Sequence, residues 1–354
     1  MLRDRLCPCF GSQSSGDTGP DLDPVLLVSG IGGSILHSKK KLFGIEFETR
    51  VWVRILFSDM EFKKKLWSLY NPKTGYTESL DKDVEILVPD DDYGLYAIDV
   101  LDPSLVIKLL HFSEVYHFHD MIDMLVGCGY KKGTSLFGYG YDFRQSNRID
   151  KLMDGLKVKL ETAYKASGGR KVTIISHSMG GLLVMCFMSL HNEFIEGFEA
   201  YFFVSRWTMH QLVISIFRVV DSLVECPSVY EMLPNPYFSW KMQPQINVWR
   251  GHTEDGETSV KLESYSPIES ISLFKEALRH NELDYGGNTI ALPFNFSILN
   301  WAAGTRKLID NAKLPSGVRF YNIYGTSFDT PFDVWYVIES LYQLGSICFM
   351  ENDF

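Results

Sequence analysis

Short apolar runs alternate along the chain with longer segments in which apolar residues recur at helical spacing. The runs predict strands and lie at residues 24–28, 134–138 and 172–175. The helical segments lie at residues 115–125, 152–166 and 180–191. The run at 24–28 is apolar throughout, which is typical of a strand buried on both faces. Strands that alternate with helices predict a parallel sheet covered by helices, an α/β fold.

The composition is that of a folded protein with a sizeable core. The chain has 354 residues, of which 45% are hydrophobic and 14% aromatic. Its formal net charge of −10 argues against nucleic acid as a partner and against electrostatic binding to anionic membranes. Binding to neutral lipid surfaces is not excluded by this charge, because the insertion of apolar side chains matters more there than charge.

The six cysteines predict reduced thiols, because their spacing fits neither a disulfide framework nor a zinc site. No signal peptide and no apolar run of bilayer-spanning length is found. These observations favour a cytoplasmic location with peripheral membrane contact. Cys7 and Cys9 beside Phe10 leave palmitoylation open, although unmodified thiols are the simpler interpretation.

Residues 171–184 have the pattern of a nucleophile elbow. A β-branched run leads to a tight turn at Ser178, and an apolar helix follows. The positions two before and two after the serine must be small in such a turn, and Ser176 and Gly180 meet that need. The pattern predicts that Ser178 is a nucleophile above the end of a strand, at the positive end of the next helix. An ordinary strand–turn–helix with a surface serine is the alternative.

The first predicted strand ends in a glycine-rich loop at residues 29–34. Its spacing fits neither a Walker loop nor the dinucleotide fingerprint. An oxyanion loop fits better, because such hydrolases take one backbone N–H from the residue after the nucleophile and one from an early loop. Ile31 and Met179 are then the oxyanion-hole candidates. A glycine turn without a catalytic role stays open.

No metal or cofactor site is predicted. His117 and His119 lie two residues apart in a predicted helix, so they do not share a face. The acidic run at residues 90–92 lacks the ligand spacing of a calcium loop. Asp142 and Arg144, which stand among aromatic residues, predict a structural ion pair near the floor of a pocket.

Residues 39–62 combine basic residues with aromatic and aliphatic ones. Two interpretations stay open for this segment. It forms a lipid-facing lip beside the active-site loop, or it is a packed excursion of the chain.

Three motifs together resemble the lecithin–cholesterol acyltransferase family. They are Val-Ser-Gly-Ile-Gly-Gly at 28–33, Tyr-Asp-Phe-Arg at 141–144 and Ser-His-Ser-Met-Gly-Gly at 176–181. Within the family the chain is most similar to the plant phospholipase A-like branch, in particular its member numbered four. The resemblance covers most of residues 24–333. It implies an α/β-hydrolase fold with cap and lid insertions, a phospholipid substrate, and a serine mechanism without a cofactor.

Site residues follow from the same resemblance. Ser178 matches the nucleophile, and Ile31 and Met179 match the oxyanion-hole positions. Residues 1–23 are rich in Ser, Gly, Asp and Pro, which predicts a flexible segment. The resemblance implies a hydrolase domain at 24–333 with its cap around 200–300. A divergent tail then follows at 334–354.

Two departures from the family pattern affect the prediction. In the family, a strand and a glycine-containing loop follow the nucleophile helix, and neither is found between residues 192 and 201. In addition, residues 213–222 form an apolar insertion that the family pattern does not match. The family's catalytic Asp and His motifs are not found either, because the chain diverges near residue 334. We therefore expect an incomplete sheet that lacks both this strand and a C-terminal one.

No catalytic Asp or His is assigned, because none of the candidates after Ser178 has the family's sequence context. These candidates are Asp221, Asp255, Asp284, Asp329, Asp333, His191, His210, His252 and His280. His177 adjoins the nucleophile, and its side chain is expected to point away from Ser178. Three hypotheses follow: an active serine acyl hydrolase or acyltransferase, a catalytically inactive lipid-binding relative, or a faulty gene model of a longer enzyme.

Overall fold

The computed structural model describes eleven stretches of the chain. They are residues 22–42, 45–52, 65–104, 116–192, 194, 198–203, 223–254, 257–314, 318–323, 334–340 and 343–347. The chain divides into two compact units, each described by itself. Unit 1 comprises Met1–Ser205, Cys226–Glu231 and Ile298–Tyr324, and unit 2 comprises Arg206–Glu225, Met232–Ser297 and Gly325–Phe354.

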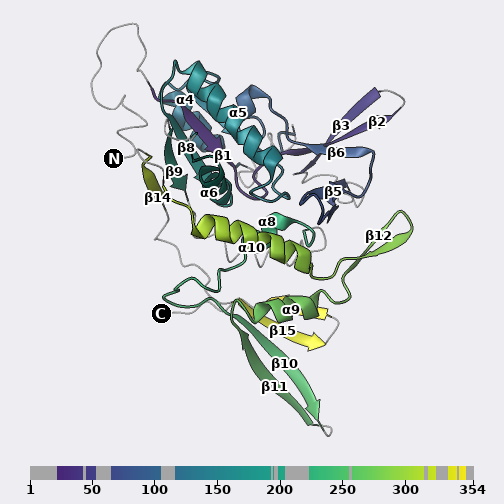
Figure 1. Cartoon of the computed structure of the whole chain (residues 1–354). Coiled ribbons are helices and arrows are strands. Elements are labelled where there is room, and N and C mark those ends of the chain that lie inside the picture. The colour runs from purple at the N-terminus through teal and green to yellow at the C-terminus, as the bar shows by residue number, and fades with distance from the viewer. Residues whose placement is uncertain are drawn as a thin grey trace. The chain divides into compact units, whose positions relative to one another are not determined.

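Unit 1 is built on a five-stranded parallel sheet with the strand order β14-β9-β8-β1-β7 (Figure 1). Its strands are β1 (Val25–Val28), β7 (Leu136–Tyr139), β8 (Val172–His177), β9 (Phe198–Phe203) and β14 (Phe320–Ile323). The last residue of β1, Val28, lies opposite Tyr139 on one side and Ser176 on the other. The predicted parallel α/β sheet is thereby confirmed.

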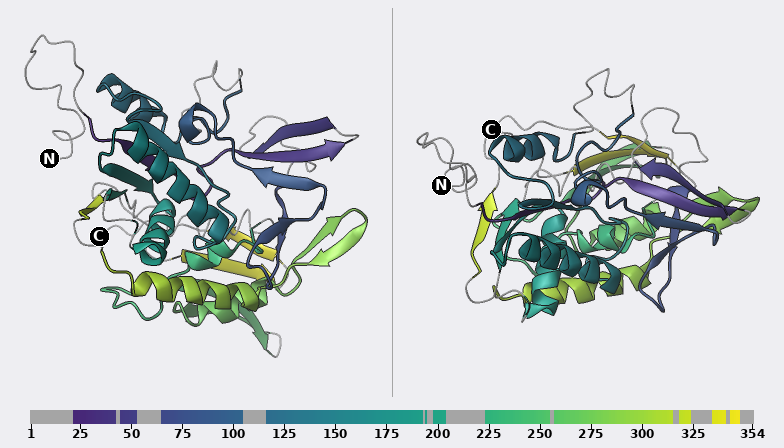
Figure 2. Two further views of the ribbon diagram at one scale, coloured as in Figure 1. Left: turned by 45° about the horizontal axis from the view of Figure 1, so that its top comes forward. Right: turned by 90° about the horizontal axis from the view of Figure 1, so that it is seen from above.

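Helices cover both faces of this sheet. The helices on the sheet are α4 (His119–Gly127), α5 (Asp150–Ala166) and α6 (Gly180–Leu190). Two further described helices are the short α8 (Pro227–Glu231) and α10 (Phe296–Asp310), of which all but the first two residues of α10 belong to unit 1. The view from above shows α4 and α5 on opposite sides of the strands (Figure 2). Helix α5 buries Leu152, Met153, Leu156, Leu160 and Ala163, which recur every three or four residues as the sequence pattern predicts.

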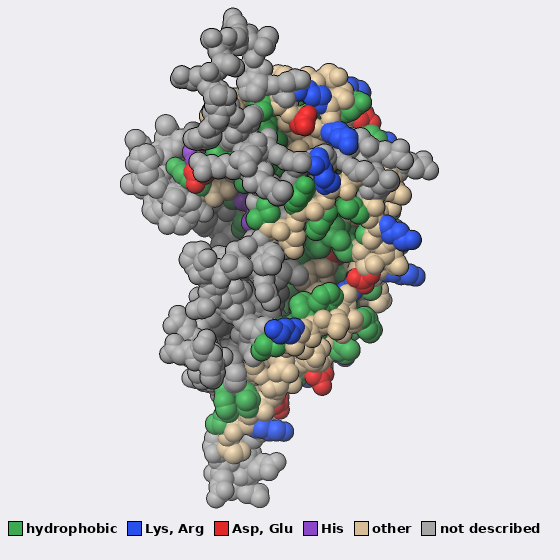
Figure 3. Space-filling model, turned by 90° about the vertical axis from the view of Figure 1, so that its left-hand side faces the viewer, with side chains coloured by type: hydrophobic (Ala, Val, Ile, Leu, Met, Phe, Trp, Pro, Cys, Tyr) green, Lys and Arg blue, Asp and Glu red, His purple; other side chains and the backbone are tan. Residues whose placement is uncertain are grey.

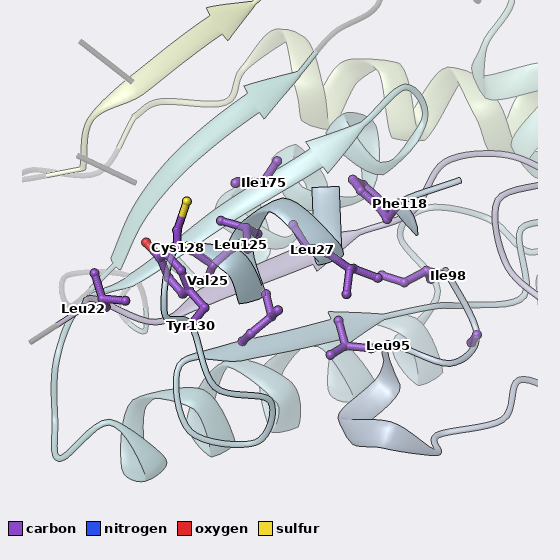
Figure 4. Close-up of a cluster of buried hydrophobic side chains, with 13 residues drawn as sticks. Leu22, Val25, Leu27, Leu95, Ile98, Phe118, Leu125, Cys128, Tyr130 and Ile175 are labelled. Carbon is purple, nitrogen blue, oxygen red and sulfur yellow. The ribbon is translucent and has the colours of Figure 1, made fainter. Parts of the chain in front are cut away.

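The face of the sheet under α4 holds a cluster of 13 buried side chains (Figure 4). Val25 and Leu27 of β1 point into this cluster with Leu125 of α4, and all three are fully buried. Burying such a side chain contributes about 1.5–3 kcal/mol. Alternate residues of β1 therefore point to this face, and the whole strand is buried as its apolar sequence predicts.

The expected gap beside the nucleophile strand is absent, so the prediction of a missing strand there was wrong. Strand β9 runs parallel to β8, with Ala200 opposite Ile174, and β14 pairs with the far side of β9. An unpaired edge beside β8 would expose a row of backbone N–H and C=O groups. The aromatic run around Tyr201 supplies the missing partner.

β14, next to β9, is an edge strand of the described sheet. The later strands β15 (Val334–Ser340) and β16 (Gln343–Ile347) join a different sheet, in unit 2. The absence of a further C-terminal strand beyond β14 stays a prediction, because residues 324–333 and 348–354 lie outside the described residues.

Smaller elements flank the central sheet of unit 1. A three-stranded antiparallel sheet has the order β3-β2-β6, and β4 pairs with β5. Their bounds are β2 (Leu36–Leu42), β3 (Ile45–Trp52), β4 (Ser68–Tyr70), β5 (Thr77–Ser79), β6 (Val84–Leu87) and the 3-10 helix η2 (Asp92–Gly94).

A buried carboxylate joins three segments of unit 1. Glu231 at the end of α8 accepts hydrogen bonds from Ser146 Oγ, from the backbone and side-chain N–H groups of Asn147, and from Thr305 Oγ1, at 2.5–2.8 Å. Burial raises the pKa of Glu231, although these hydrogen bonds oppose the shift. The network fixes α8 and α10 to the loop that precedes α5.

The described residues of unit 2 form a four-stranded sheet with the order β11-β10-β15-β16, a hairpin of β12 and β13, and the helix α9. The remaining bounds are β10 (Ile246–Glu254), β11 (Glu257–Tyr265), β12 (Glu282–Tyr285), β13 (Asn288–Ala291) and α9 (Ser270–Ala277). Arg250 of β10 forms ion pairs with Glu263 and Glu276, both at 2.7 Å.

One cysteine departs from the reduced-thiol prediction. Cys128, just after α4, is disulfide-bonded, whereas Cys186 and Cys226 are buried thiols outside any disulfide. The spacing of cysteines along a chain does not reveal which of them meet in space. Among the described helices, none is both long and apolar enough to span a membrane.

Candidate active site

Ser178 lies in the turn between β8 and α6, where the sequence predicts an elbow. Its φ is +54°, in the left-handed region that non-glycine residues rarely adopt. Such a conformation costs about 1–3 kcal/mol and persists only where the surroundings impose it. The sharp strand-to-helix turn is therefore present, and it leaves Ser178 partly exposed.

Close packing against β1 imposes this turn. A methyl group on Gly180 would lie 2.3 Å from the Ser29 carbonyl oxygen and 3.0 Å from that of Val28. Only glycine fits at this position, which explains the small residue that the pattern requires two places after the serine. Ser176, the other small position, is completely buried.

The glycine loop reaches the serine turn directly. A methyl group on Gly30 would lie 2.9 Å from Ser178 Cβ and 2.8 Å from the His177 carbonyl oxygen. The loop is closed by a hydrogen bond from the Gly33 N–H to the Gly30 carbonyl at 3.1 Å. Two segments that are far apart in sequence are thus brought together as an oxyanion loop requires.

Both predicted oxyanion donors flank this contact. Ile31 belongs to the glycine loop, and Met179 directly follows the serine and is buried. Within the described residues, neither the Ile31 N–H nor the Met179 N–H donates a hydrogen bond. The part of the chain that the structure describes thus offers these amides no acceptor, and their role in an oxyanion hole stays a prediction.

Trp52 holds the glycine loop from the side of β3. Its Nε1–H donates to the Gly32 carbonyl at 2.7 Å, and its ring covers Gly32, whose φ is +67°. The indole also meets Phe143 edge-on, with ring centroids 5.5 Å apart. Sequence reasoning placed Trp52 in the 39–62 segment and missed this role.

The base of the loop is tied to the sheet by hydroxyl groups. Ser29 Oγ and Ser34 Oγ are hydrogen-bonded at 2.7 Å, and both residues are completely buried. Ser34 Oγ also accepts the Tyr141 N–H at 3.0 Å. The loop is therefore fixed at its start, its middle and its end.

Two histidines pack beside the loop, and both are neutral near pH 7. Burial, aided by the proximity of His177, lowers the pKa of His117 to about 3, and burial also lowers the pKa of His177. Their ring centroids are 5.2 Å apart. His177 Nδ1 is buried, faces Gly30 and forms no hydrogen bond within the described residues, so this histidine is not positioned as the base for Ser178.

The ion pair of Asp142 and Arg144 is present as predicted. Arg144 donates to both carboxylate oxygens, Nε to Oδ1 at 2.8 Å and Nη2 to Oδ2 at 2.7 Å, and its side chain is 2% exposed. A further bond runs from Nη1 to the Leu66 carbonyl at 2.9 Å. Burial opposes ionisation of Asp142, but the Arg144 charge and hydrogen bonds outweigh it, so the pKa of Asp142 is lowered.

No described side chain hydrogen-bonds to the Ser178 hydroxyl, so the described part of the chain assigns no general base. Several candidates lie outside that part, namely Asp221, Asp255, Asp329, Asp333 and His210. Asp284, His252 and His280 belong to unit 2. His191 stacks on Phe187 at the end of α6. His119 pairs with Asp99 at 2.7 Å, which occupies one of its ring nitrogens.

The described part of the 39–62 segment has both exposed and buried apolar side chains, so both interpretations stay open. Ile45 and Phe47 of β3 are exposed at 60% and 51%, whereas Val51 is buried. Residues 53–64, which complete the predicted lip, lie outside the described residues.

Comparison with known proteins agrees with this fold. Residues 47–234 match the family model for lecithin:cholesterol acyltransferase. The chain belongs to this family, whose fold is the α/β-hydrolase, and lies in its plant branch. The chain is also similar to a chain in the crystal structure of the Tle4–Tli4 complex, with a TM-score of 0.50 and 14% identity over 89% of this chain and 77% of that one.

Three relatives illustrate the family. Phospholipase A(1) LCAT3 of Arabidopsis thaliana is 61% identical over 97% of this chain and 82% of its own length. Lecithin-cholesterol acyltransferase-like 4 of the same plant is 45% identical over 91% of this chain and 64% of its own length, so identity to the member numbered four is lower. The human lysosomal phospholipase A and acyltransferase is 31% identical over 34% of this chain and 27% of its own length.

Proposed function

We propose that this protein is a lipid acyl hydrolase or acyltransferase that acts on phospholipid esters through Ser178. The observation that carries the proposal is the left-handed conformation of Ser178 in a turn against which the glycine loop packs. Relatives named as phospholipase A(1) and as phospholipase A and acyltransferase support the substrate class.

The reaction has two acyl-transfer steps. Ser178 Oγ attacks the ester carbonyl carbon, the Ile31 and Met179 N–H groups stabilise the oxyanion, and the alcohol leaves from an acyl-enzyme. Water or an acceptor hydroxyl then attacks the acyl-enzyme and releases Ser178. The residues that we name perform these steps without a metal or an organic cofactor.

A catalytically inactive, lipid-binding relative is the second candidate function. One observation favours it: within the described residues, no side chain is placed to take the proton of Ser178. An unassisted serine hydroxyl is a weak nucleophile, because its pKa lies far above 7.

A serine-directed fluorophosphonate probe separates the two candidates. We expect it to label the folded protein on Ser178, as read by peptide mass spectrometry, because an activated serine beside oxyanion donors reacts with such probes. Ser176, buried two residues earlier, serves as the internal control and stays unlabelled. Folded protein that takes up no probe would favour the inactive relative.

Trp52→Phe tests whether the glycine loop must be held for catalysis. The change removes the hydrogen bond to Gly32 and keeps an aromatic ring, so we expect kcat to fall about 3- to 10-fold with KM little changed. Trp301→Phe is the matched control, because Trp301 also donates one ring N–H, to Ser146 Oγ at 2.8 Å. Equal losses of kcat in both variants would contradict a specific role for Trp52. Initial rates on a soluble short-chain ester give both constants.

We also propose a peripheral membrane location on the cytoplasmic side. The acidic balance of the chain and the two buried thiols of Cys186 and Cys226 support this location. Fractionation of cells, with and without a carbonate wash, tests the location.

A further inference from the structure

Apolar side chains reach the surface of this protein among charged side chains of both signs (Figure 3). In unit 2, four large ones follow one another within six residues. Tyr237 is 85% exposed, Phe238 59%, Trp240 37% and Met242 64%. We call residues 235–242 the aromatic loop.

The aromatic loop is held in shape by its own hydrogen bonds. Asn235 accepts the Tyr237 N–H at its side-chain oxygen and the Phe238 N–H at its carbonyl, at 3.0 and 3.3 Å. The same carbonyl accepts Trp240 Nε1–H at 2.9 Å. The Phe238 and Trp240 rings meet edge-on, 4.8 Å apart. The rings are therefore exposed on an ordered turn. Because the polar groups of this turn are already hydrogen-bonded, its transfer into an apolar environment costs less free energy.

The charge of this segment differs from that of the chain. The protein has 44 acidic residues, yet residues 232–253 contain none. Lys241 is exposed within the loop, while Arg250, the other cation of this segment, is neutralised by Glu263 and Glu276. The aromatic loop therefore carries one positive charge and no negative charge of its own.

We propose that the aromatic loop is a docking site for a phospholipid surface. Tyr237, Phe238 and Met242 enter the layer between headgroups and acyl chains, Trp240 lies at its edge, and Lys241 pairs with lipid phosphate. Aromatic rings with a polar tip suit this layer, and a lysine beside them suits its phosphates. The inference rests on the proposed function, because a phospholipase must reach its substrate in such a surface.

The test compares vesicle binding of the full chain and of three variants. Tyr237→Ser with Phe238→Ser removes two exposed rings, and we expect affinity for phosphatidylcholine vesicles, measured by flotation, to fall about 10- to 100-fold. Ile268→Ser is the matched control, because Ile268 is 59% exposed in unit 2 outside the loop, and its affinity should be unchanged. Lys241→Gln should weaken binding to phosphatidylcholine vesicles less than the loop variant does, and should weaken it more when the vesicles also contain phosphatidylserine.

Two readouts separate this inference from the proposed function. Hydrolysis of a soluble short-chain ester and fluorophosphonate labelling of Ser178 should be the same in the loop variant and the wild type. If labelling fails in both while vesicle binding still depends on the loop, the proposed function is wrong and the docking site stands. Unchanged vesicle binding by the loop variant would overturn the docking site. So would an equal loss in Ile268→Ser, or a change of oligomeric state instead of vesicle affinity.

Discussion

Ser178→Ala is expected to lower phospholipid hydrolysis by about 10⁴- to 10⁶-fold, the loss that follows removal of a catalytic serine. The substitution deletes only Oγ. It keeps the Cβ atom against which Gly30 packs, so the glycine loop has the same neighbour as before. The measurement is the release of fatty acid from phosphatidylcholine vesicles, with circular dichroism as the check on folding.

Ser176→Ala is the matched control for this variant. It makes the same chemical change two residues earlier, at a buried hydroxyl that has no hydrogen-bond partner within the described residues. We expect near wild-type turnover from it. A Ser178→Ala protein that hydrolyses phospholipid at the wild-type rate would remove Ser178 from the mechanism.

A large loss in Ser178→Ala also bears on the unassigned general base. It would require a base in the active protein, and the described residues place none on the Ser178 hydroxyl. His117 and His177 are poor candidates, because burial lowers the pKa of both and His177 Nδ1 faces Gly30. The search would then turn to His210 and to the aspartates outside the described residues.

The parts of the fold that the sequence predicts well are set by local pattern. β1 is a continuous apolar run, α5 repeats its apolar residues at helical spacing, and the small residue at Gly180 marks a turn with no room for a side chain. Each of these signals is contained in a few consecutive residues. The same holds for Asp142 and Arg144, which are two residues apart.

The features that the sequence did not predict depend on contacts between distant residues. Trp52 bonds to a backbone carbonyl 20 residues earlier, and Glu231 binds Ser146 and Asn147 about 85 residues earlier. The pairing of β9 with β8 is another such contact, because a short aromatic run does not specify which strand it pairs with. Such partners are visible only once the chain is folded.

Arg144→Met is expected to lower the free energy of unfolding by about 3–5 kcal/mol, the typical cost of leaving a buried charge without its partner. Arg144 gives Asp142 two hydrogen bonds and a positive charge in a place where both side chains are largely buried. Urea unfolding followed by circular dichroism measures the loss. Lys151→Met is the control, because the exposed Lys151–Glu85 pair at 3.7 Å should contribute less than about 1 kcal/mol.

The pH dependence of this variant gives a second, independent test. In the wild type the pKa of Asp142 is lowered, so the stability from the pair is complete above the unfolded pKa of about 3.9 and is lost as the pH falls through the lower, folded value. Without Arg144, burial becomes the dominant effect and raises the pKa of Asp142. Ionised Asp142 then destabilises the fold near pH 7, and its protonation relieves that cost. The loss of unfolding free energy in Arg144→Met should therefore be smaller at pH 5 than at pH 7. A loss that is constant over this range would mean that it comes from the lost packing of the arginine and not from the unpaired carboxylate.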